Sequence, residues 1–85
     1  MRLTKAERKW IDDVQALLSA CPSKRLGFYT IGDPDVILYD LTKEAKIEAV
    51  MDENDRFDFG SAVEKAGAAL HEYLVFPACV HSTSG

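Results

Sequence analysis

The chain has 85 residues, of which 47% are hydrophobic and 28% charged, and its formal net charge is −4. This composition predicts one small globular domain over residues 1–85 and argues against a disordered tail. No apolar run approaches the roughly 18 to 20 residues that a membrane span requires. Because the acidic balance lacks a concentrated basic stripe, we also expect no direct nucleic-acid binding.

The cysteine content and the first residues bear on the compartment. Cys21 and Cys79 stand far apart and form no disulfide framework. No apolar signal-peptide region follows the charged N-terminal residues. We therefore expect a cytoplasmic protein.

A first helix is predicted to begin at Thr4 and to end before Pro22. Thr4 and Glu7 have the spacing of a capping box, in which each side chain accepts a hydrogen bond from a free backbone N–H. An apolar stripe then recurs at helical spacing: Trp10, Ile11, Val14, Leu17, Leu18 and Cys21. We expect this stripe to pack on the chain's own sheet; a partner-binding helix is the alternative.

Residues 26–40 read as a β-hairpin. Two runs rich in β-branched and aromatic residues flank the turn sequence Gly32-Asp33-Pro34-Asp35. Both arms carry apolar residues on both faces, so the sheet should be covered fully on one side and partly on the other.

The segment after the hairpin has two readings. Residues 41–55 fit a helix capped by Thr42, which their Ala, Glu, Lys and Met content favours, and they also fit a third strand. Ser61 and Glu64 then repeat the capping-box form ahead of a helix over about 62–74. Residues 75–81 could form a final edge strand, where a proline is tolerated. The predicted fold class is therefore α+β, with helices packed on one face of a small, mainly antiparallel sheet built on the hairpin.

Metal or nucleophilic chemistry has weak support in the sequence. Cys79 and His81, with Cys21 and His71 elsewhere, could ligate zinc, but no ligand pair has the usual close spacing. No base is placed beside either thiol to activate it. We expect no cofactor and no enzymatic activity, and a small metal- or thiol-dependent protein centred on Cys79 and His81 is kept as an alternative.

The local charge suggests a different function. Residues 33–58 hold nine acidic and three basic side chains, a balance of −6. We expect a non-catalytic interaction or regulatory module that engages a basic surface of another protein, because complementary charge speeds such encounters. The expected contacts are acidic residues and one aromatic anchor: Asp33, Asp35, Asp52, Glu53, Asp55, Phe57 and Asp58. A homo-oligomer, or an oligomerisation unit without a ligand, is a further alternative.

Taken whole, this short acidic chain, with its ending Phe76-Pro77-Ala78-Cys79-Val80-His81-Ser82-Thr83-Ser84-Gly85, resembles the small accessory proteins that bacteriophages and prophages encode. The resemblance implies a host-interaction or regulatory role rather than a metabolic one. It assigns no role to any single residue.

Overall fold

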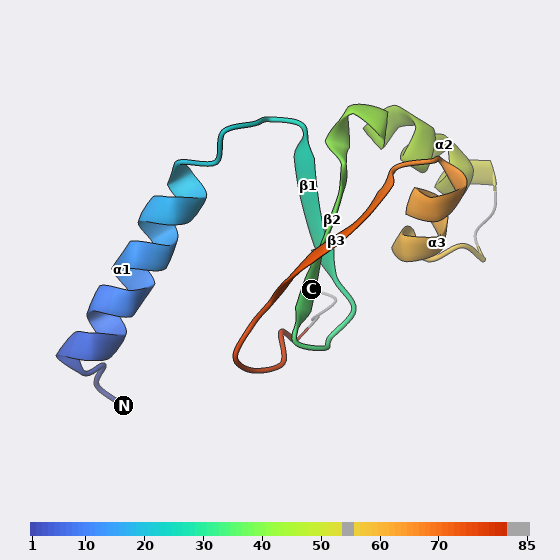
Figure 1. Cartoon of the computed structure of the whole chain (residues 1–85). Helices are drawn as coiled ribbons and strands as arrows, with labels where there is room; N and C mark the ends of the chain where they lie inside the picture. The colour runs from blue at the N-terminus through green and yellow to red at the C-terminus, as the bar shows by residue number, and fades with distance from the viewer. Residues whose placement is uncertain (54–55, 82–85) are drawn as a thin grey trace.

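The computed structural model describes residues 1–53 and 56–81 (Figure 1). The elements in chain order are α1 (Lys5–Ser19), β1 (Leu26–Thr30), β2 (Asp35–Asp40), the 3-10 helix η1 (Leu41–Lys43), α2 (Glu44–Glu53), α3 (Phe59–Lys65) and β3 (Ala69–Val75). The strands form one antiparallel sheet in the order β1-β2-β3. The predicted α+β class and its hairpin are confirmed.

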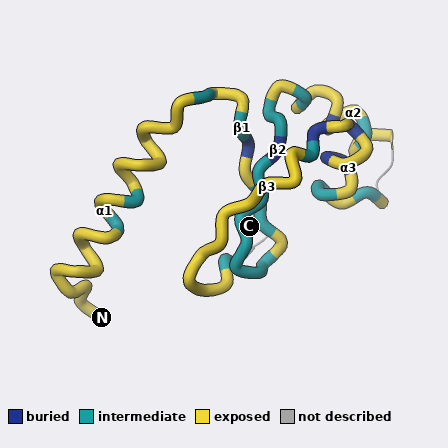
Figure 2. Tube along the Cα trace, viewed as in Figure 1, coloured by how far each residue is buried: buried dark blue, intermediate teal, exposed yellow. Residues whose placement is uncertain are grey.

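Helix α1 forms as predicted, but it does not pack on the sheet. The Thr4 hydroxyl accepts from the Glu7 N–H at 3.0 Å, and the Glu7 carboxylate accepts from the Thr4 N–H at 2.7 Å. No residue of α1 is buried, and Figures 1 and 2 show the helix standing away from the sheet. The expectation that its apolar stripe covers the chain's own sheet is therefore wrong. Local forces form the helix by themselves, whereas its docking depends on the path of residues 20–25.

The hairpin turn is held by short-range hydrogen bonds. The strands are in register from Leu26 opposite Asp40 to Thr30 opposite Val36. Gly32 has a φ of +93°, which glycine adopts without strain. The Asp33 carboxylate accepts from the Asp35 N–H at 2.9 Å, as an aspartate in a tight turn commonly does. This accounts for Asp33 as a turn residue.

Residues 44–53 are helical, so the helix reading of this segment is confirmed over that range. The next helix differs from its prediction at both ends. Its N-cap is Asp58, whose carboxylate accepts from the Ser61 N–H at 2.7 Å, rather than Ser61 itself. The helix ends at Lys65, and Gly67 follows with a φ of +72°.

Residues 69–75 form strand β3 instead of the second half of the predicted helix. They pair with the free edge of β2, and the hydrogen bonds gained there override the helical spacing of the side chains. The strand expected over 75–81 is also wrong, because β3 ends at Val75 and residues 76–81 have no regular structure. The Phe76 N–H donates to the Pro34 carbonyl at 2.8 Å, so this segment lies against the hairpin turn.

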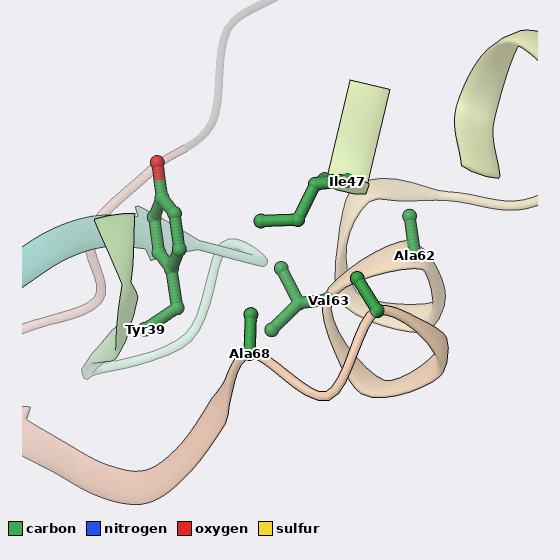
Figure 3. Close-up of a cluster of buried hydrophobic side chains, with 6 residues drawn as sticks. Tyr39, Ile47, Ala62, Val63 and Ala68 are labelled. Atoms are coloured by element: carbon green, nitrogen blue, oxygen red, sulfur yellow. The ribbon is translucent and has the colours of Figure 1, made fainter. Parts of the chain in front are cut away.

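The buried core lies at one end of the sheet, where α2 and α3 cover one face (Figures 2 and 3). It consists of small and branched residues around one tyrosine: Tyr39, Ile47, Ala62, Val63, Ala66 and Ala68. Tyr29 and Phe59 extend it, and their ring centroids lie 5.9 and 5.2 Å from that of Tyr39. Burial, the larger cause, raises the pKa of Tyr29 and of Tyr39, so both phenols are neutral at physiological pH.

The Asp58 cap predicts a pH effect. The hydrogen bond from the Ser61 N–H lowers the pKa of Asp58 in the folded chain. Its stabilisation is therefore complete above the unfolded pKa, about 4, and is lost as the pH falls below that value. We expect Asp58→Asn, which keeps a capping side chain, to lose less unfolding free energy between neutral pH and about pH 3 than the parent chain does. Urea unfolding at the two pH values measures this, and an equal loss in both chains would contradict it.

Candidate interaction surface

The two faces of the sheet differ in what covers them. Residues paired directly across antiparallel strands point to the same face. Tyr29 and Tyr39 therefore lie on the face that α2 and α3 cover, whereas Phe28, paired with Leu38, and its neighbours lie on the opposite face. We call that opposite face the outer face. It carries five apolar residues, Leu26, Phe28, Val36, Leu38 and Leu74, and the register places the polar residues Thr30, Asp40 and Glu72 on the same face.

An open groove of about 650 Å³ lies between the outer face and the C-terminal end of α1. We call it the outer groove. It is lined by apolar residues of α1 and its C-terminal extension, of the outer face and of the segment after β3: Leu17, Leu18, Ala20, Cys21, Pro22, Leu26, Phe28, Val36, Leu38, Leu74 and Phe76. Phe28 is 49% exposed, Leu74 45% and Leu17 76%. Such a contiguous apolar patch on a small chain typically marks an interaction site.

The two sides of α1 differ in polarity and in the contacts that their side chains make. On the polar side, Arg8 pairs with Asp12 at 2.8 Å and Lys9 with Asp13 at 2.6 Å, one helical turn apart in each case. On the apolar side, Trp10 is 55% exposed. Four charged residues of the polar side thus pair with one another in water, while the apolar stripe lacks a covering element within the described residues.

The structure does not bring the expected acidic contacts together. Asp33 and Asp35 lie at the hairpin turn, whereas Asp52, Glu53 and Asp58 belong to the α2–α3 end, beyond the opposite end of β2. The length of strand β2 separates the two groups. They do not form the single surface that the charge count suggested, and Asp55 lies outside the described residues.

Phe57, the expected aromatic anchor, is half-buried, and the ammonium group of Lys65 lies 5.2 Å from the centroid of its ring. This cation–π contact within the chain already uses one face of the ring. Phe57 is therefore less free to insert into a partner than its place in an acidic loop suggested.

The residues of the metal alternative are exposed. Cys21, Cys79, His71 and His81 all face solvent. Over residues 1–53 and 56–81, no three His, Cys, Asp or Glu side chains are grouped so that they could hold a metal ion. The same part of the chain has no buried polar or charged side chain.

The outer groove was not among the sites expected from the sequence, although two signals for it were present. The hairpin carries apolar residues on both faces, and the stripe on α1 needs a surface to cover it. The position of α1 could not be predicted from the sequence, and this position leaves the apolar stripe and the outer face uncovered.

No protein-family model, curated protein sequence or solved structure is similar enough to this chain to indicate its family or its function. Among the helices that the structure describes, none has the length and apolar character needed to cross a membrane.

Proposed function

We propose that this chain is a non-catalytic protein-interaction module that binds an amphipathic helix of a protein partner in its outer groove. The observation that carries the proposal is the apolar outer face, which α2 and α3 leave uncovered. A helix that buries a Phe or Leu side chain fully contributes about 1.5–3 kcal/mol per residue to the free energy of association. A few such residues in one groove supply the central apolar contacts of a typical interface.

The direction of the apolar side chains favours a helix over an extended peptide as the occupant of the groove. An added strand would pair with the free backbone edge of β1 or β3, whereas the apolar side chains here project from the face of the sheet. A helix with apolar residues at spacings of three and four presents the complementary stripe.

The acidic residues could contribute to the approach of a partner but not to the contacts in the groove. A basic partner could be steered by Asp52, Glu53 and Asp58, but these lie at the α2–α3 end, away from the outer groove. The resemblance to phage accessory proteins supports a host protein as the source of the helix. Binding of a helix in the outer groove requires neither the acidic residues nor a host protein as the partner.

Photo-crosslinking tests the proposal directly. With p-benzoylphenylalanine in place of Phe28, irradiation in the native cell is expected to join the chain covalently to whatever protein occupies the outer groove, identified by mass spectrometry. The same group in place of Lys46, an exposed residue of α2, is the matched control. Adducts at position 28 that are absent at position 46 support the proposal. A lack of protein adducts at position 28 would overturn it.

A further inference from the structure

We infer that the helix in the outer groove is α1 of a second copy of this chain, so that two copies exchange their first helices in a symmetric dimer. The inference rests on the proposed function and names its partner. Each copy would supply one helix and one groove, which is the self-complementary arrangement that two-fold symmetry requires.

The two uncovered surfaces match in chemistry. The stripe on α1 has its apolar residues at helical spacing and leaves Trp10 and Leu18 about half exposed. The outer face presents Phe28 and Leu74 at a similar level of exposure. The Arg8–Asp12 and Lys9–Asp13 pairs lie on the polar side of α1, so these four charges can stay in water when the stripe packs on a sheet.

The surface area agrees with a dimer. The chain exposes 6922 Å², whereas a compact monomer of its mass exposes about 5,000 Å². Its radius of gyration is 15.5 Å, against about 12 Å for a compact domain of this length. The excess of about 1,900 Å² per chain is more than twice the roughly 800 Å² that each partner buries in a standard interface. Exchange of α1 would remove much of this excess.

The connection between α1 and β1 favours binding of α1 from a second copy. The alternative is closure, in which α1 folds back onto the outer face of its own chain. The Cys21 N–H donates to the Leu18 carbonyl at 3.2 Å, and the Arg25 N–H donates to the Ser23 hydroxyl at 3.0 Å. The Arg25 carbonyl accepts from the Leu41 N–H at 2.8 Å, which ties the connection to the sheet. Closure would rearrange this connection, whereas a second copy can place its α1 in the groove as it stands.

Two variants, each altering one surface, test the exchange. Trp10→Asp with Val14→Asp disrupts the stripe at two residues that do not line the groove, and Phe28→Asp disrupts the groove; none of these three side chains belongs to the buried core. Ala16→Asp with Ser19→Asp adds the same two charges on the other side of α1 and serves as the control.

Light scattering should give twice the 9.4 kDa chain mass for the parent and for the control. Each surface variant alone should raise the dissociation constant at least about 30-fold. An equimolar mixture of the two surface variants should recover part of the dimer, because it contains one intact helix and one intact groove. Trp10, the single tryptophan, provides a second signal, since its emission should shift to the red on dilution of the parent.

The outcomes separate the inference from the proposed function. A parent monomer whose Phe28 position crosslinks to a different protein overturns the exchange and leaves the proposed function standing. A parent monomer with no crosslinked protein overturns both. A dimer that the mixture fails to recover indicates contact between two sheets and also overturns the exchange. Circular dichroism of each variant identifies any loss of folding.

Discussion

Replacement of Ile47 with alanine is expected to lower the free energy of unfolding by about 2–5 kcal/mol. Ile47 is 1% exposed and is one of the two largest fully buried side chains of the chain's described part. A protein of this length has a total stability of only about 4–13 kcal/mol. The loss would therefore remove a large share of that stability, because Ile47 joins α2 to Tyr39 of the sheet and to Val63 of α3 in the buried core.

Met51→Ala is the matched control for this prediction. Met51 lies on the same helix but is 36% exposed, so we expect a change within about 0.5 kcal/mol. Urea unfolding at one fixed protein concentration measures both variants, since the stability of a dimer depends on concentration. Equal effects of the two substitutions would show that the core does not lie where the structure places it.

A methyl group at Gly27 is expected to destabilise the sheet by about 1–3 kcal/mol. Gly27 pairs directly with Tyr39, and a Cβ at this position would overlap the Tyr39 ring. That ring is buried and contacts the rings of both Tyr29 and Phe59, so it cannot move aside without disturbing the core. Gly27→Ala should consequently lower the urea midpoint.

Gly60→Ala is expected to act in the opposite direction. An added Cβ there has its nearest neighbour, the Tyr29 hydroxyl oxygen, at 3.6 Å, which is an ordinary contact. Gly60 lies within α3, where alanine is favoured over glycine by up to about 1 kcal/mol. A raised midpoint for Gly60→Ala with a lowered one for Gly27→Ala would identify close approach of the Tyr39 ring as the cause. A loss of stability in both variants would contradict this explanation.

The core and the outer groove lie on opposite faces of the same sheet, so their variants should report different properties. Substitutions at Ile47 or Gly27 change the stability of the folded chain. Substitutions at Phe28, Trp10 and Val14 change what the chain binds. This division lets a loss of binding be distinguished from a loss of folding.

Local signals in the sequence were enough to predict several elements. The capping box at Thr4 and Glu7 and the side-chain pairs one turn apart stabilise α1 without help from the rest of the chain. The turn at Gly32 and Asp33 and its β-branched arms predict the hairpin for the same reason. These interactions join residues at most a few positions apart, so a single sequence contains them.

Tertiary structure decided the rest. The apolar residues of 69–75 recur at helical spacing. The segment nevertheless forms β3, because the edge of β2 offers backbone hydrogen bonds that an isolated segment lacks. The same long-range placement separates Asp33 and Asp35 from Asp52, Glu53 and Asp58, which the charge count had joined into one surface. Local sequence signals are therefore enough to predict an amphipathic helix at α1 and a hairpin over residues 26–40. Only the path of residues 20–25 through space left the apolar stripe and the outer face uncovered, because that path depends on contacts between distant residues.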